Sequence, residues 1–290
     1  MKHLVFVVNP RSGIDRQKAI QQAIADTLDH SQYTYAIQHT AYARHGTEIA
    51  KQAAEMGAYA VVAVGGDGSV NDIAKGLLGT NTAIAIIPKG SGNGMARSLS
   101  IPLNERKALQ VINIGNTVMM DVGHANDKTF ISNAGVGFDT VISEAFALSK
   151  TRGFKAYSWL VAKHLWKYKS LNWNITANGK EFTEKAFMIT VANGQQFGYN
   201  FKIAPEASWT DGLLDIVIVK DFPRLLGGIL LIRAMFGNIL KSPYVKHFRS
   251  EEVIISNPEL KIFQTDGDAH FSENKIHFRV ESAALKVIVP

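Results

Sequence analysis

The sequence predicts an α/β N-terminal domain with a parallel, doubly wound sheet, followed by a mainly antiparallel β-sandwich domain. Over the first 115 residues, strand patterns alternate with helix patterns, as in parallel sheets whose crossovers are helices. After Asp121, short alternating strands separated by Asn-Gly and Asp-Gly pairs dominate. We therefore expect domains at residues 1–120 and 121–290, and leave open whether the C-terminal strand returns to the first domain.

The elements of the first domain follow from its apolar runs and helical periodicities. Mainly apolar runs indicate strands, and longer segments with apolar residues three and four positions apart indicate helices. The expected strands are Leu4–Val8, Tyr33–His39, Ala60–Val64 and Ala83–Ile87. The expected helices are Asp15–Leu28, Arg44–Met56, a helix that follows the first glycine-rich turn and runs through Leu78, Met95–Leu99 and Glu105–Ile112.

The second domain is read in the same way. Two helical stretches are expected, around Val141–Tyr168 and Pro223–Leu240, and hairpin turns at Asn178-Gly179, Asn193-Gly194 and Asp266-Gly267. The expected strands are Thr129–Asn133, Asn172–Ala177, Ala186–Ala192, Leu213–Val219, Val253–Ser256, Leu260–Gln264, Lys275–Val280 and Ala284–Val289.

Two glycine-rich turns are the clearest functional signal. Gly65–Asp72 (GGDGSVND) and Pro88–Gly94 (PKGSGNG) each follow a buried strand and precede a helix. Glycines let the backbone approach a ligand closely, and a following helix N-terminus favours phosphate. Asn9–Gly13 ends the first strand, so all three segments should share one sheet edge. The pattern predicts a polyphosphate site in which Asp67 holds Mg²⁺ or steers a hydroxyl, the alternative being a plain turn residue.

The common nucleotide motifs are missing. A G-x-G-x-x-G fingerprint, a P-loop, an H-R-D or D-F-G set and an H-E-x-x-H pair do not occur, and the nine histidines have no metal-ligand spacing. The absence of cysteine excludes disulfides and fits a reducing cytosol. The N-terminus is interpreted as a buried strand, and Leu225–Leu240 as a core or interfacial helix, since Arg233 interrupts it.

The net charge of +6 is concentrated in one stretch. No acidic residue lies between Glu144 and Glu181, whereas seven cations and several aromatic residues do. Such a stretch could lie on an anionic membrane or form a solvated helix face with its aromatic residues in the core. Nucleic acid is not an expected partner, since no binding motif accompanies the charge. The cations are Lys150, Arg152, Lys155, Lys163, Lys167, Lys169 and Lys180.

The string Gly65–Asp72 is similar to the GGDGT-x-N-E signature of the diacylglycerol kinase catalytic-domain family, which includes bacterial lipid kinases and sphingosine kinases. The resemblance covers nearly the whole chain. Asp72 and Asp268 stand where the family has glutamates, and Gly94 where it has an acid. Further matching segments are Asn9-Pro10 with Ser12-Gly13, Pro88–Asn93, Ala134–Asp139, Asn193-Gly194 with Gly198, Ala204-Pro205, Asp211–Asp215 and Asp266–Asp268.

The resemblance implies an ATP- and Mg²⁺-dependent kinase that phosphorylates a lipid hydroxyl, cytoplasmic and peripherally membrane-bound. Asp268 takes the place of the catalytic base, with Asp67 in the phosphate and metal shell. A structural Mg²⁺ is implied at Ser208, Asp211 and the Leu213 carbonyl. The implied nucleotide-binding residues are Asn9, Pro10, Arg11, Ser12, Gly13, Thr40, Gly65, Gly66, Asp67, Gly68, Ser69, Asn71 and Ser91.

Two other functions stay open: phosphorylation of a soluble acceptor, as by an NAD kinase, and nucleotide binding without catalysis. An NAD kinase should lack Pro88–Asn93 in this form. The substitutions Asp72, Gly94 and Asp268 are what make a non-catalytic regulator conceivable. The identity of the lipid and the oligomeric state, a homodimer included, are left open by the sequence.

Overall fold

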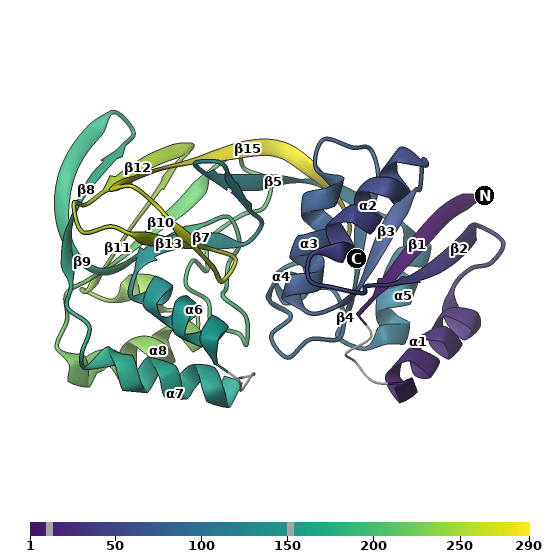
Figure 1. The fold of residues 1–290 in the computed structure, drawn as a ribbon, viewed down its shortest axis with the longest axis horizontal. Helices are drawn as coiled ribbons and strands as arrows, with labels where there is room; N and C mark the ends of the chain where they lie inside the picture. Colours follow the sequence, from purple (N-terminus) through teal and green to yellow (C-terminus); the bar gives the residue numbers. More distant parts are fainter. Residues whose placement is uncertain (10–13, 150–153) are drawn as a thin grey trace. The chain divides into compact units, whose positions relative to one another are not determined.

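The computed structural model describes the chain over residues 1–9, 14–149 and 154–290 (Figure 1). These residues form two compact units, the first comprising 1–120 with 283–290 and the second 121–282. Strand β15 (Lys275–Ile288) contributes residues to both units. The predicted fold class, a parallel α/β part followed by an antiparallel β part, is confirmed.

The first unit is built on a parallel sheet. Its strands are β1 (Lys2–Val8), β2 (Tyr33–His39), β3 (Ala60–Gly65) and β4 (Ala83–Pro88), in the order β2-β1-β3-β4. Every residue of β3 and β4 is buried, as expected of strands covered on both faces. The end of β15 joins in parallel beside β4, where Val287 pairs with Ile84. Because β2 and β3 lie on opposite sides of β1, the winding direction reverses between β1 and β3, the usual place of a ligand site.

Five helices accompany this sheet within the described part of the unit. Helix α2 packs on α3, and α1 packs on α5 (Figure 1). The Asn113 side chain joins the second pair, because it donates to the Thr27 carbonyl at 2.7 Å and accepts from the Asp29 N–H at 2.9 Å. The bounds are α1 Ile14–Thr27, α2 His45–Glu55, α3 Asp67–Leu77, α4 Gly94–Ser98 and α5 Glu105–Ile114.

The second unit is built from antiparallel pairs around an apolar core that includes Phe130, Trp173 and Phe278. Its longest strand, β9 (Lys180–Ala192), pairs with three neighbours, β7, β8 and β10. The other strands are β5 Thr117–Ala125, which begins in the first unit, β6 Lys128–Phe130, β7 Asn133–Gly137, β8 Leu171–Ala177, β10 Leu214–Lys220, β11 Val245–Ser250, β12 Glu252–Ser256, β13 Ile262–Thr265 and β14 Asp268–Phe271.

The helices of this unit differ from the two stretches that the sequence predicts. The first stretch contains two helices, α6 (Phe138–Leu148) and α7 (Phe154–Leu165). The second is one short helix, α8 (Gly227–Met235), between the 3-10 turns η2 (Arg224–Leu226) and η3 (Ile239–Lys241). None of the helices seen in the described residues combines the length and the apolarity that spanning a membrane requires.

Two strand-level predictions were wrong. Asn193-Gly194 is not a hairpin turn, because the next strand begins only at Leu214. Instead, the buried Asn193 amide donates to the carbonyls of Asp121 and Ile131, each at 2.8 Å. The two expected strands Lys275–Val280 and Ala284–Val289 are one strand, β15. The left-handed residue Ala283 (φ 53°) lies within this strand and does not end it.

Candidate functional site

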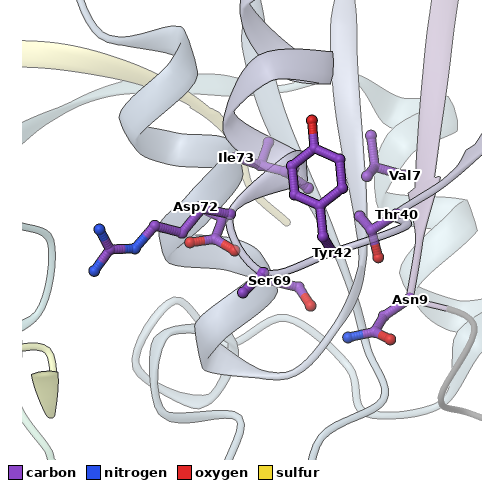
Figure 2. A pocket seen from close by; sticks show the side chains of 10 residues that line it. Val7, Asn9, Thr40, Tyr42, Ser69, Asp72 and Ile73 are labelled. Carbon is purple, nitrogen blue, oxygen red and sulfur yellow. The ribbon is translucent and has the colours of Figure 1, made fainter.

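A cavity of about 70 Å³ lies at the carboxyl end of the parallel sheet in the first unit (Figure 2). Three residues expected at the nucleotide, Asn9, Thr40 and Ser69, line it. They come from the ends of β1 and β2 and from the first turn of α3, so the cavity lies beside the reversal of winding. The other lining residues are Val7, Tyr42, Ala43, Arg44, Gly46, Asp72 and Ile73.

The two glycine-rich turns touch each other through their backbones. The Lys89 N–H donates to the Gly65 carbonyl at 2.8 Å, which continues the pairing of β3 with β4. A Cβ added to Gly66 would lie 2.9 Å from the Gly90 Cα, closer than real Cβ contacts permit. Glycine is therefore needed at this crossing for steric reasons, and the two turns form one continuous edge.

The second turn is held by a reciprocal pair of hydrogen bonds. The Asn93 Oδ1 accepts from the Gly90 N–H at 2.9 Å, and its Nδ2 donates to the Gly90 carbonyl at 2.8 Å. Asn93 has a left-handed backbone (φ 50°), which asparagine tolerates well. Lys89, although it lies in the turn, forms an ion pair with Glu105 of α5.

Asp67 links the two turns. It is the first residue of α3, and its Oδ1 accepts from the Met95 N–H at 3.3 Å, at the start of α4. Burial raises the pKa of this carboxyl, while the backbone N–H groups of Met95, Gly94 and Asn93 oppose the rise. A partly desolvated carboxylate thus lies among amide donors where the two turns meet, and Gly94, which stands in place of an acid, supplies no second carboxylate.

The remaining nucleotide-binding candidates differ in their surroundings. Gly68 and Ser91 are exposed, whereas Asn71 is buried on the inner side of α3. A Cβ added to Gly68 would meet open space, so steric crowding does not explain why this residue is glycine. Pro10, Arg11, Ser12 and Gly13 lie outside the described residues.

The candidate metal ligands of the second unit lie in one turn before β10. The Thr210 N–H donates to Ser208 Oγ at 3.4 Å, and the Leu213 N–H donates to the exposed Asp211 carboxylate at 3.2 Å. Asp121, which the sequence did not single out, is buried and accepts from the Gly212 N–H at 2.7 Å. Hydroxyl, carboxylate and carbonyl oxygens are the ligands that Mg²⁺ prefers, so the oxygen atoms of this turn suit that ion.

Among the described residues there is no group of three or more His, Cys, Asp or Glu side chains placed to hold a metal. Asp215, four residues after Asp211, is buried and accepts from His247 Nε2 at 2.6 Å and Arg249 Nε at 3.3 Å. Its carboxylate is thus engaged with the neighbouring strand β11.

Asp268 begins β14 in the hairpin formed with β13, and it is exposed. The preceding Asp266 is a structural anchor with a left-handed backbone (φ 51°). Its carboxylate accepts from the N–H groups of Ile131 and Ser132, both at 2.8 Å, and of Asn133 at 3.2 Å. These bonds fix the turn, so Asp268 is presented from a rigid support.

A buried polar network supports the same turn from inside, and the sequence did not predict it. Gln264 Oε1 accepts from the Gly267 N–H at 2.9 Å, while its Nε2 donates to Asn133 Oδ1 at 3.1 Å and Asp139 Oδ2 at 3.2 Å. Burial raises the pKa of Asp139 to about 7, although hydrogen bonds from Gln264 and Thr140 lower it. In the sequence, the one feature that could have pointed to this network is the G-x-G-F-D string that contains Asp139.

The raised pKa of Asp139 predicts a pH-dependent stability. The unfolded chain has the ordinary aspartate pKa of 3.8, so the folded state binds more protons between about pH 4 and pH 7. The contribution of Asp139 to the free energy of unfolding is therefore greatest below pH 4 and is lost as the pH rises through 7. The slope can reach about 1.4 kcal/mol per pH unit.

Asp139→Asn should flatten this part of the profile, measured by urea unfolding between pH 5 and pH 7.5. Glu144→Gln, an exposed change on the same helix α6, is the matched control and should keep the wild-type slope. An Asp139→Asn profile as steep as that of the wild type would contradict the assignment.

The geometry defines a class of protein: a doubly wound α/β domain with a glycine-lined edge, followed by a β-sandwich. The family model described as diacylglycerol kinase catalytic domain matches residues 3–125, and the YegS C-terminal NAD kinase beta sandwich-like domain matches residues 132–289. The chain belongs to the YegS and diacylglycerol kinase family of lipid kinases. The family resemblance found in the sequence motifs is thereby confirmed.

Three comparisons illustrate the relationship. The chain is 32% identical over 243 residues to a probable lipid kinase YegS-like protein of Chromohalobacter salexigens, covering 79% of this chain and 76% of that protein. It is 26% identical over 273 residues to a diacylglycerol kinase of Bacillus subtilis, covering 92% and 90%. A crystal structure of a diacylglycerol kinase from Bacillus anthracis has the same fold, with a TM-score of 0.75, 21% identity and coverage of 100% and 97%.

Proposed function

We propose that the chain is an ATP- and Mg²⁺-dependent lipid kinase that transfers the γ-phosphoryl group of ATP to the hydroxyl of a diacylglycerol-like or sphingoid lipid. The observation that carries this proposal is the junction of the two glycine turns, where Asp67 lies among the amides of α4. Backbone amides of the glycine-rich turns and the N-terminus of α3 at one sheet edge suit a polyphosphate.

The nucleotide would lie along this edge. Asn9, Thr40 and Ser69 line the cavity beside it and offer polar groups to the nucleotide. Gly65, Gly66 and Gly68 let the phosphates approach the backbone, and Asn71 and Ser91 belong to the same two turns. Pro10, Arg11, Ser12 and Gly13, which follow β1, complete the proposed set.

Two kinds of Mg²⁺ position are proposed. Asp67 can hold the ion that accompanies ATP, and Ser208, Asp211 and the Leu213 carbonyl can hold a structural ion in the second unit. When bound, Mg²⁺ spreads the negative charge of the transferring phosphoryl group. The residues themselves orient oxygen ligands, with Asp121 fixing the Asp211 turn through the Gly212 N–H.

Asp268 is the proposed general base. Its carboxylate accepts the proton of the lipid hydroxyl as that oxygen forms a bond to the γ-phosphorus, and the bond between the γ-phosphorus and the bridging oxygen breaks to release ADP. Aspartate is one methylene shorter than the family glutamate and therefore reaches less far. The hydrogen bonds of Asp266 hold the turn in place and so support a fixed position for this shorter side chain.

The acceptor is proposed from chemistry and from the relatives' names. Two relatives are named a lipid kinase and a diacylglycerol kinase, which supports a lipid alcohol. We further propose that the enzyme is cytoplasmic and meets its acceptor at a membrane surface, in keeping with the cysteine-free composition and the basic stretch before Glu181.

The test is a radiolabelled ATP transfer assay against diacylglycerol, monoacylglycerol, phosphatidylglycerol, sphingoid bases and NAD, each with Mg²⁺ and with a chelator. We expect one lipid to be labelled only with Mg²⁺. Labelling of NAD alone would support phosphorylation of a soluble acceptor instead. Tight ATP binding without ADP release on any acceptor would support a regulator without catalysis.

A further inference from the structure

Helix α8 is apolar on two opposite faces. Its inner face, Gly227, Leu230 and Ala234, is buried against the second unit. The opposite face carries side chains spaced by four, three and four residues, the spacing of a helical stripe. They are Leu225 of the preceding turn, Ile229, Ile232 and Phe236, with exposed fractions of 83%, 52%, 56% and 76%. An exposed apolar stripe of this kind commonly marks a surface that binds a partner or a membrane.

A second exposed stripe runs from α7 into the turn that follows it, since Trp166 comes directly after the last helical residue, Leu165. Trp159 and Trp166 are 61% and 63% exposed, and Lys163 lies between them with its Nζ 5.0 Å from the centre of the Trp159 ring. Trp173, in contrast, is buried in the core. The exposed tryptophans of this aromatic stretch thus lie in α7 and in the turn after it.

The two helices share one buried contact. Leu160 of α7 and Leu230 of α8 belong to the same apolar cluster, and a Cβ on Gly227 would lie 3.0 Å from Leu165 Cδ2. Their inner faces are therefore occupied by each other and by the unit. We call the exposed residues Trp159, Trp166, Leu225, Ile229, Ile232 and Phe236 the outer stripes.

The chain segments that carry the two helices contain no acidic residue, although Asp221, just before the second segment, pairs with Lys185 and Arg224. Residues 145–180 and 222–250 contain no Asp or Glu, although both stretches contain several Lys and Arg. Beside α8 a hollow of about 420 Å³ is lined by Ile232, Phe236, Asn238 and the two cations Arg233 and Lys241. In the part of the chain that the structure describes, neither cation forms an ion pair.

We propose that the outer stripes of α7 and α8 form a membrane-binding surface that lies on an anionic bilayer, with Arg233 and Lys241 contacting lipid phosphates. This inference rests on the proposed lipid kinase function. Apolar stripes flanked by cations are typical of helices that lie in the membrane interface, where tryptophan is also favoured. A second copy of the chain would bring like charges together, whereas an anionic bilayer is complementary.

Co-sedimentation with phosphatidylcholine vesicles, with and without phosphatidylglycerol and in the absence of ATP, tests this surface. We expect binding that requires phosphatidylglycerol and weakens with salt. Ile232→Ser with Phe236→Ser, and separately Arg233→Glu with Lys241→Glu, should each lower the partition coefficient by about tenfold or more. Met56→Ser and Lys51→Glu, exposed changes in the first unit, are the matched controls and should bind as the wild type does.

Unfolding curves of all four variants should match the wild type, because the changed side chains are at the surface. Vesicle binding that is unchanged in both double variants would overturn the proposal. So would a wild-type dimer that Ile232→Ser with Phe236→Ser dissociates without affecting vesicle binding, since the stripe would then be a contact between copies. Vesicle binding without phosphorylation of any lipid supports the surface and contradicts the proposed kinase, so the two failures can be told apart.

Discussion

Asp268→Asn is expected to lower kcat for lipid phosphorylation by about 100- to 10,000-fold, the range that a positioned general base contributes. Asparagine has nearly the same size but cannot accept the hydroxyl proton. Asp268 is exposed at the start of β14, and the turn is held by Asp266 and Gln264 through other atoms. Unfolding free energy and ATP affinity should therefore stay close to those of the wild type.

The matched control for this variant is Glu273→Gln. Glu273 is an exposed acid five residues along, just before β15, and its substitution changes the charge in the same way. It should retain wild-type turnover in the radiolabelled transfer assay. If Asp268→Asn also retains wild-type turnover, Asp268 is not the general base.

Asp67→Asn is expected to reduce turnover by about 100-fold or more, because a carboxylate at the phosphate edge would lose its charge toward Mg²⁺ and the transferring group. The amide oxygen of asparagine can still accept from the Met95 N–H, so the link between the two turns is kept. The free energy of unfolding should change by no more than about 1 kcal/mol.

This second experiment separates two roles of Asp67. Glu55→Gln, an exposed change at the end of α2 in the same unit, controls for the loss of one negative charge and should leave turnover unchanged. An Asp67→Asn enzyme with wild-type turnover and normal Mg²⁺ dependence would show that Asp67 only caps α4. Turnover and unfolding are measured on the same preparations, so a folding defect is recognised directly.

Much of the first unit could be predicted from local patterns. The range Ala83–Ile87 matches β4 almost residue for residue, because a buried parallel strand is a short apolar run. The range Tyr33–His39 matches β2, although only Tyr33 of that edge strand is buried. The shared edge of the glycine turns could be predicted too. Parallel strands place their carboxyl ends on one side of the sheet, whatever the side chains do.

The second unit was less predictable for an identifiable reason. Strands β5, β7, β11 and β14 were not predicted. In β7, Asn133–Gly137 contains two glycines and alternates weakly, so it lacks a clear strand pattern. Asn193-Gly194 has the composition of a hairpin turn, yet Asn193 is buried between two carbonyls. An Asn-Gly pair indicates only a local backbone preference for a turn, whereas long-range hydrogen bonds determine the role of Asn193.

The sequence by itself determined the order of strands and helices, the glycine-lined edge and the family, because each is encoded in short contiguous patterns. Only the tertiary structure decided that Gly66 and Gly90 touch and that Asp67 joins the two turns. It also decided that Gln264 and Asp139 support the Asp268 hairpin and that α8 leaves one apolar face in solvent. These features depend on contacts between residues distant along the chain, which local periodicity does not record.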